Sequence, residues 1–212
     1  MSFDGGPITE GMLVIISGPS GSGKGTVVKN LEPAKGYALS VSVTTRAPRP
    51  GEQEGRDYFF KSEDEFIYMR DNNELLEHAL YVNNYYGTPR HYVEDMIKSG
   101  KIVILEIEVQ GALQVKDKFP EAVLIFLVPP SIKELARRLA LRKTESAATI
   151  DDRLNKAMAE ISFIPRYEYL VLNDEVALAV GRINVIVEAE KLKPKRMGPI
   201  IDKITDKGEF LC

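Results

Sequence analysis

Residues 18–26, with the sequence GPSGSGKGT, have the composition of a loop that binds phosphate groups. Gly18, Gly23 and Lys24 satisfy the pattern G-x-x-x-x-G-K-[ST] except at its last position, where Gly25 replaces the hydroxyl residue that usually holds magnesium. Thr26 offers a hydroxyl one residue later, about 100° further round a helix. Glycines let backbone N–H groups approach phosphate oxygens closely. We expect these residues to bind the phosphates of a donor nucleotide: Gly18, Pro19, Ser20, Gly21, Ser22, Gly23, Lys24, Gly25 and Thr26.

A second group of residues has the chemistry of a phosphate site. Arg46 and Arg49 lie in the segment SVSVTTRAPRPGE, and Tyr58 and Tyr86 follow in GRDYFF and NNYYGTP. Two planar guanidinium groups and two phenols suit a monophosphate dianion, which would act as the acceptor of a transferred group. The alternative is a solvated loop rich in proline and arginine.

Two acidic residues, Glu106 and Glu108, lie two positions apart in ILEIEVQG. On a strand they would point to the same side, near its C-terminal end, where α/β folds place their ligands. Acids in that place need a cation or hydrogen-bond donors, unless the pair is simply solvated.

Three arginines could stabilise a phosphoryl group during its transfer. Arg138 and Arg142 are four residues apart, on one face of a predicted helix, and Arg153 belongs to the next helix. Phosphoryl transfer requires positioning and charge stabilisation rather than a nucleophilic side chain. Arg137 illustrates the alternative, an ordinary solvated helix charge.

The overall charge argues against a polyanionic partner. The chain of 212 residues has 28 Lys and Arg against 31 Asp and Glu, so its formal net charge is −3. Such a field repels nucleic acid. If the substrates are small phosphates, the arginines must be concentrated in one cleft.

Cysteine and histidine are too few for a disulfide or a metal cluster. Cys212 is the one cysteine, and we expect His78 and His91 to be surface or hydrogen-bonded residues rather than ligands. The first apolar run, MLVIIS, is too short for a signal peptide or a membrane span, so we expect a cytoplasmic protein with no membrane partner.

Hydrophobic runs predict a parallel α/β core. A strand over 12–17 precedes the glycine-rich loop and a helix over about 24–31 follows it, which favours phosphate binding over a tight turn with a solvated lysine. Further strands are predicted at 101–109, 121–128 and 167–173, and a final helix over about 175–192. Capping boxes at Ser62 with Glu65 and Ser131 with Glu134 predict helix starts, and Pro89 and Gly100 bound another helix.

Two insertions interrupt this core. Period-2 alternation over 39–61 predicts a small antiparallel lobe, and an Arg-rich segment over about 138–158 predicts a lid. The predicted division is core with phosphate loop (11–39), acceptor lobe (40–100), core (101–137), lid (138–158), core (159–192) and C-terminal tail (193–212).

Taken in order, these motifs resemble the guanylate kinase family. The resemblance rests on GPSGSGKGT, on SVSVTTRAPRPGEQEGRDYFF at 40–60, on NNYYGT at 83–88 and on LEIEVQG at 105–111, and it extends from about residue 12 to about 190. It implies a three-layer P-loop core with a parallel sheet, an inserted mixed or antiparallel lobe that binds a nucleoside monophosphate, and an Arg-rich helical lid. The implied reaction is ATP + GMP to ADP + GDP, with Mg²⁺ accompanying ATP. The GKGT ending also looks like that of adenylate kinases, so Gly25 is compatible with nucleotide phosphotransfer.

The resemblance also implies residue roles. Glu77 would read guanine because N1–H and N2–H₂ are adjacent donors to a carboxylate, whereas adenine has an acceptor at N1. Asn173 and Asp174 would contact the adenine of ATP, although Asp174 could instead cap a helix. The implied GMP-binding residues are Ser42, Arg46, Arg49, Tyr58, Glu77, Tyr86, Thr88, Glu106 and Glu108.

Two positions depart from the family pattern. Glu108 stands where the family often has Asp, and Lys143 stands where it has Gly, which affects the expected turn in the lid. Two alternatives to a GMP kinase stay open: a kinase of another monophosphate such as AMP or UMP, and a guanylate-kinase-like binding module without catalysis. The intact donor loop favours an enzyme. Oligomeric state is not predicted.

Overall fold

The computed structural model describes residues 11–31, 36–81, 83–140, 147–198 and 200–201. The strands are β1 (Met12–Ser17), β2 (Tyr37–Leu39), β3 (Val43–Thr44), β4 (Phe59–Phe60), β5 (Leu75–Tyr81), β6 (Asn84–Pro89), β7 (Ile102–Glu106), β8 (Val123–Val128) and β9 (Tyr169–Leu172). The α-helices are α1 (Lys24–Lys29), α2 (Glu63–Asp71), α3 (Arg90–Lys98), α4 (Val109–Lys118), α5 (Ile132–Ala140), α6 (Ala147–Ile161) and α7 (Val176–Lys191). Two 3-10 helices are η2 (Ile164–Arg166) and η3 (Pro194–Arg196).

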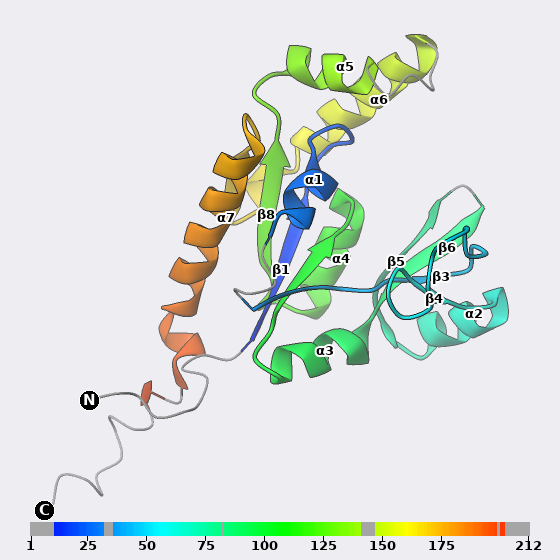
Figure 1. Ribbon diagram of the computed structural model, residues 1–212, viewed down its shortest axis with the longest axis vertical. Helices are drawn as coiled ribbons and strands as arrows, with labels where there is room; N and C mark the ends of the chain where they lie inside the picture. Colours follow the sequence, from blue (N-terminus) through cyan, green and yellow to red (C-terminus); the bar gives the residue numbers. More distant parts are fainter. Residues whose placement is uncertain (1–10, 32–35, 82, 141–146, 199, 202–212) are drawn as a thin grey trace, which may run out of the picture.

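The core is a five-stranded parallel sheet with the order β2-β7-β1-β8-β9. Every residue of the central strand β1 is buried, because helices cover both faces of the sheet. Val14 and Ile16 pack in a cluster with α1 and α7, whereas Leu13 and Ile15 pack in a cluster with α3 and α4. Figure 1 shows the resulting three layers. The predicted α/β fold with a parallel core is therefore confirmed.

The inserted lobe has its own sheet, with the order β4-β3-β6-β5. Its strands are mixed in direction, since β3 pairs in parallel with β4 and antiparallel with β6. Phe66 of α2 is fully buried against Val43 and Leu75, and its ring stacks on Tyr85 with centroids 5.2 Å apart. This small core lets the lobe hold its shape beside the main sheet (Figure 1).

Helices α5 and α6 form a separate layer at the end of the core where β1 and β8 terminate (Figure 1). Leu135 and Leu139 of α5 pack on Leu154 and Ala157 of α6 in an apolar cluster of their own. The predicted lid arginine Arg142 and the neighbouring Lys143 lie outside the described residues.

Two predicted strands differ from the structure. The alternating segment 39–44 is split, with β2 in the core sheet and β3 in the lobe, because period-2 alternation predicts a strand without specifying its sheet. The strand predicted at 101–109 ends at Glu106, and the buried Val109 instead begins α4. The lobe sheet is mixed, which agrees with the mixed or antiparallel lobe expected for this fold class. The hairpin β5–β6 was not predicted from the sequence.

The predicted helix boundaries are largely confirmed. Ser62 and Glu65 form a complete capping box at α2, and Pro89 occupies the N-cap position of α3. At α5, Glu134 N–H donates to Ser131 Oγ at 3.1 Å, but the Glu134 carboxylate bonds Arg137 and Arg138. The predicted capping box at Ser131 is therefore only half formed. Its return bond to the Glu134 carboxylate is replaced by bonds from Arg137 and Arg138.

A buried charge cluster fastens the C-terminal end of α7 to the core. Glu190 is 1% exposed. Its Oε1 accepts a hydrogen bond of 2.7 Å from the Tyr169 hydroxyl and forms an ion pair of 2.5 Å with Lys193 Nζ. Arg196 Nη2 lies 3.7 Å from Glu190 Oε2 and donates to the Glu121 carbonyl. Burial opposes ionisation of Glu190, but the bonds from Lys193 and Tyr169 outweigh it and lower its pKa.

We predict that Glu190→Gln lowers the free energy of unfolding by about 1–3 kcal/mol at pH 7, since it leaves the Tyr169 hydroxyl, the Lys193 ammonium group and the buried Arg196 without their charged acceptor. A carboxylate with a lowered pKa stabilises the fold above its unfolded pKa, and this contribution disappears as the pH falls through the folded pKa. The difference from the unchanged protein should therefore vanish in acid. Urea titrations from pH 7 to pH 3 measure it. Glu188→Gln, two residues away and exposed, is the control, and an equal effect of both variants would contradict the prediction.

Candidate active site

The glycine-rich loop joins β1 to α1 at the C-terminal end of the sheet. Gly18 and Gly23 have φ values of +143° and +92°, and each leaves no room for a side chain. A Cβ on Gly18 would lie 2.2 Å from the Leu127 carbonyl oxygen, and one on Gly23 would lie 2.4 Å from Asn173 Nδ2. The loop backbone is thus held against β8 and against the end of β9.

Lys24 is the first residue of α1 and is largely buried. Its Nζ donates to the carbonyl oxygens of Gly18 at 2.6 Å and of Pro19 at 3.3 Å. The ammonium group therefore lies over the loop itself, close to the space that phosphate groups would enter. Thr26, two residues later, is exposed.

Gly25 faces the carboxylate of Glu106 across the gap between α1 and β7. A Cβ on Gly25 would lie 3.3 Å from Glu106 Oε1 and 3.4 Å from Oε2, tighter than most real contacts. Desolvation raises the pKa of Glu106, while the charges of Lys24 and Lys29 oppose this effect. The acid therefore occupies the side of the loop where a hydroxyl residue would otherwise project.

Asn173 and Arg138 brace the loop from the opposite side. Asn173 Nδ2 donates to the Ser22 carbonyl at 2.7 Å, and Arg138 Nη2 donates to the Asn173 carbonyl at 3.0 Å. Glu134 holds Arg138 in place through a bond of 2.8 Å to Nε. Hydrogen bonds from Arg137 and Arg138 keep the pKa of Glu134 at about 2, so the carboxylate is ionised at neutral pH.

In the lobe, Arg46 lies beside the two predicted tyrosines. Its Nη2 donates to both carboxylate oxygens of Glu52 at 2.9 Å, and its guanidinium carbon is 5.3 Å from the centroid of the Tyr58 ring. The rings of Tyr58 and Tyr86 meet edge to face at 6.0 Å. Arg49 is exposed, and its backbone N–H also donates to Glu52.

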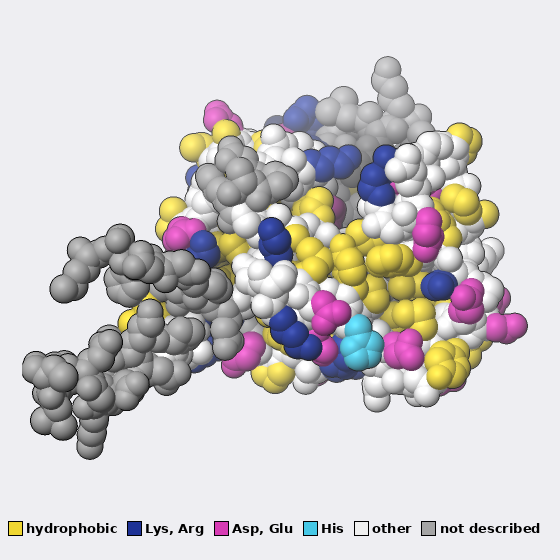
Figure 2. All heavy atoms as spheres, turned by 60° about the horizontal axis from the view of Figure 1, so that its bottom comes forward, with side chains coloured by type: hydrophobic (Ala, Val, Ile, Leu, Met, Phe, Trp, Pro, Cys, Tyr) yellow, Lys and Arg dark blue, Asp and Glu magenta, His cyan; other side chains and the backbone are white. Residues whose placement is uncertain are grey.

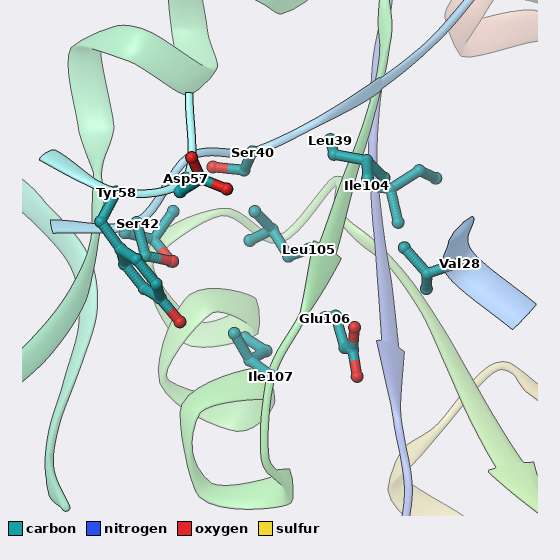
Figure 3. Close-up of a pocket in the computed structure, with 11 residues that line it drawn as sticks. Val28, Leu39, Ser40, Ser42, Asp57, Tyr58, Ile104, Leu105, Glu106 and Ile107 are labelled. Atoms are coloured by element: carbon teal, nitrogen blue, oxygen red, sulfur yellow. The ribbon is translucent and has the colours of Figure 1, made fainter. Parts of the chain in front are cut away.

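A pocket of about 170 Å³ separates the lobe from the core sheet. Figure 3 shows Ser42, Asp57 and Tyr58 on the lobe side, and Ile104 and Glu106 of β7 with the following Ile107 on the core side. Thr88 also lines it. The predicted residues Ser42, Tyr58, Thr88 and Glu106 are thus brought to one cavity.

Glu77 lies on β5, is only 6% exposed, and reaches this pocket through its partner Thr88 rather than by lining it. Thr88 Oγ1 donates to its Oε1 at 2.7 Å. Among the described residues, no hydrogen bond or ion pair reaches the second oxygen, Oε2. Burial raises the pKa of Glu77, and the bond from Thr88 and the charge of Lys118 only partly offset it. Such a carboxyl group suits a ligand that brings its own hydrogen-bond donors.

The two predicted acids do not lie together on one strand. Glu108 lies beyond β7, at the N-cap position of α4, and its carboxylate is 3.6 Å from Lys156 Nζ of α6. The same ammonium group is 3.7 Å from Glu160. Burial and the charge of Glu108 raise the pKa of Glu160 to about 7, against the effect of Lys156. The strand argument was wrong because β7 ends at Glu106, and Glu108 is already the N-cap residue of α4.

Three predicted residues remain: Asp174, Arg153 and Arg142. Asp174 is not a helix cap: Glu175 occupies that position, and Asp174 accepts hydrogen bonds from Arg182, which lower its pKa. Arg153 is half-buried on α6. Arg142 lies outside the described residues, so its place in the site stays a prediction.

Sequence patterns missed the acids that orient the arginines. Glu52 follows Arg46 by six residues in the segment RAPRPGE. Glu134 precedes Arg138 by four residues on one helix face. The i, i+4 spacing of the second pair was a usable signal. Glu160 has the same i, i+4 spacing with Lys156, but its proximity to Glu108 could not be predicted because those two residues are distant in the sequence.

Three further features of the described residues concern surface charge, metal binding and membrane spans. On the face that Figure 2 shows, Lys and Arg side chains lie among Asp and Glu side chains around a hydrophobic area. Among the described residues, no group of three or more His, Cys, Asp or Glu side chains could hold a metal ion. The described helices include none that is long and apolar enough to cross a bilayer.

Comparisons with known proteins agree on one family. The family model described as guanylate kinase matches residues 10–190. The chain is 50% identical to a guanylate kinase of Oceanobacillus iheyensis over 94% of its length and 97% of that protein, and 52% identical to one of Bacillus subtilis over 92% and 97%. The crystal structure of guanylate kinase from Anaplasma phagocytophilum superposes with a TM-score of 0.69 at 36% identity, covering 89% of this chain and 90% of that one.

We predict that Gly23→Ala weakens binding of a nucleoside triphosphate by about tenfold or more, because the new Cβ would displace Asn173 and the loop amides. Gly36→Ala is the matched control: its φ is also positive, +82°, but it faces open space. Both variants carry the cost of a left-handed alanine, about 1–2 kcal/mol. Calorimetric titration with ATP measures the effect, and equal affinities of the two variants would contradict it.

Proposed function

The chain belongs to the guanylate kinase family, whose members transfer a phosphoryl group from ATP to GMP, and we propose which residues of this chain hold each nucleotide. As a nucleoside monophosphate kinase, it needs a donor site, an acceptor site and a closable gap between them. The glycine-rich loop and the lobe pocket supply groups of the right chemistry on either side of β7.

The donor site is the loop from Gly18 to Thr26. Its backbone N–H groups and the start of α1 bind the phosphates of ATP, and Lys24 exchanges its two carbonyl contacts for phosphate oxygens. Asn173 keeps the loop in register through Ser22, while Asn173 and Asp174 border the adenine. The observed bonds of these two side chains give them fixed orientations for that role.

Magnesium is the proposed companion of ATP. The carboxylate of Glu106, which faces Gly25, suits an ion held mainly by nucleotide oxygens and water, with this carboxylate as its nearest protein group. When bound, the ion neutralises charge on the phosphates. Glu106 also lines the pocket of the acceptor, so it is positioned between the two substrates.

The acceptor phosphate is assigned to Arg46, Arg49, Tyr58 and Tyr86. Glu52 holds the Arg46 guanidinium above Tyr58, so the cation is oriented before the ligand arrives. Arg49 is exposed on the same loop and is free to fold over the phosphate. A planar guanidinium with two phenols suits a dianion better than a flexible ammonium would.

Guanine recognition is assigned to Ser42, Glu77 and Thr88. The observation that supports this assignment most strongly is Glu77, a buried carboxylate with one oxygen bound to Thr88. Its second oxygen can accept from guanine N1–H or N2–H₂, whereas adenine offers no such pair of donors. Leaving this carboxylate without donors is costly, which disfavours AMP.

Transfer itself requires no nucleophilic side chain. Arg138 is already fixed beside Ser22 and Asn173, and we assign to it, with Arg46, Arg142 and Arg153, the stabilisation of charge on the moving phosphoryl group. Closure of the lid and the lobe excludes water, which would otherwise hydrolyse ATP. We place the enzyme in the cytoplasm and in purine nucleotide metabolism, with small-molecule substrates rather than nucleic acid or membrane as partners.

We predict that GMP exceeds AMP, UMP and CMP in kcat/KM by about 10³-fold or more, and that Glu77→Gln reduces this preference, because the amide cannot accept from both guanine donors. Coupled assays of ADP release with each monophosphate measure the ratios. Glu63→Gln, an exposed substitution on α2, is the control. Faster turnover of AMP than of GMP by the unchanged protein would contradict the assignment.

A further inference from the structure

Helix α4 of the core lies directly against strand β5 of the lobe, on both sides of Glu77. Lys118 Nζ donates to the Leu75 carbonyl at 3.2 Å, and the His78 N–H donates to Gln114 Oε1 at 3.4 Å. Gly111 belongs to the same face of α4, three residues before Gln114 and seven before Lys118. It meets Glu77 itself.

The contact between Gly111 and Glu77 leaves no spare room. A Cβ on Gly111 would lie 3.1 Å from Glu77 Oε2, 3.5 Å from Cδ and 3.6 Å from Cγ. Oε2 is the carboxylate oxygen that Thr88 does not bind. Any side chain at position 111 therefore presses on the oxygen that we assign to guanine.

The backbone and one carboxylate oxygen of Glu77 are both held in place, so the side chain has little room to move away from position 111. Its backbone is packed against β6, where a Cβ on Gly87 would lie 2.9 Å from the Glu77 carbonyl oxygen. Its other carboxylate oxygen is fixed by Thr88 at 2.7 Å. The remaining response is a rotation of the carboxylate, and hydrogen bonds weaken steeply when their direction is wrong.

We propose that Gly111 is a positioning residue for substrate specificity: the absence of a side chain on α4 lets Glu77 present Oε2 to the guanine ring of GMP. This inference rests on the role proposed for Glu77. Gly111 touches neither nucleotide and acts only through that carboxylate. The ATP site, on the other side of β7, is independent of it.

The first test compares Gly111→Ala with Gly181→Ala. Both glycines lie inside helices, so both substitutions raise helix propensity by about 1 kcal/mol, but a Cβ at position 181 meets nothing within 4 Å. Gly111→Ala should raise KM for GMP and lower the GMP to AMP ratio of kcat/KM by about tenfold, with KM for ATP unchanged. Gly181→Ala should change none of them. Because the ratio is measured within one sample, partial unfolding cancels.

The second test is a double-mutant cycle with Glu77→Asp. The shorter side chain withdraws the carboxylate from position 111, so Gly111→Ala should add no further loss of selectivity in the Glu77→Asp background. A purely structural defect of α4 would instead reduce selectivity or turnover equally in both backgrounds, which would overturn the proposal.

Failure of this inference can be told from failure of the proposed function. If Glu77→Gln abolishes the preference for GMP while Gly111→Ala keeps it, only the role of Gly111 is overturned. If Glu77→Gln leaves the preference for GMP intact, the guanine assignment of Glu77 fails and the role of Gly111 fails with it.

Discussion

Burial of β1 on both faces fixes the glycine-rich loop, and the other functional groups are arranged around that loop. Since every residue of β1 is enclosed, the strand cannot shift without disturbing two apolar clusters. The loop at its end therefore has a defined position, which the close approach of Gly18 to β8 and of Gly23 to Asn173 makes tighter. A fixed loop is required because backbone N–H groups bind phosphate well only when they converge without reorganisation.

The second theme is the use of acids to orient arginines before any substrate is present. Glu52 holds Arg46 beside Tyr58, and Glu134 holds Arg138 against the loop. Each guanidinium thereby loses conformational freedom in advance, so less entropy is lost when a phosphate binds. The same carboxylates also neutralise part of the charge of these arginines while no substrate is bound.

How far the sequence could predict this arrangement depended on the range of each signal. The phosphate loop and the capping box at Ser62 were recognisable because each motif lies within a segment of nine residues or fewer. The relation of Glu106 to Glu108 was mispredicted, since an apolar run does not reveal where a strand gives way to a helix. The contact of Gly111 with Glu77 joins residues 34 positions apart (111 − 77) and required the packing of α4 on β5.

In the proposed function, the donor loop and the lobe pocket open onto one gap, across which a phosphoryl group can pass. A crystal structure of the protein with GMP and a non-hydrolysable ATP analogue tests it most directly. The account predicts the analogue's phosphates on the loop amides and Lys24, guanine against Glu77, and the two facing phosphates close enough for in-line transfer. Nucleotides bound on separate surfaces, or guanine turned away from Glu77, would contradict it.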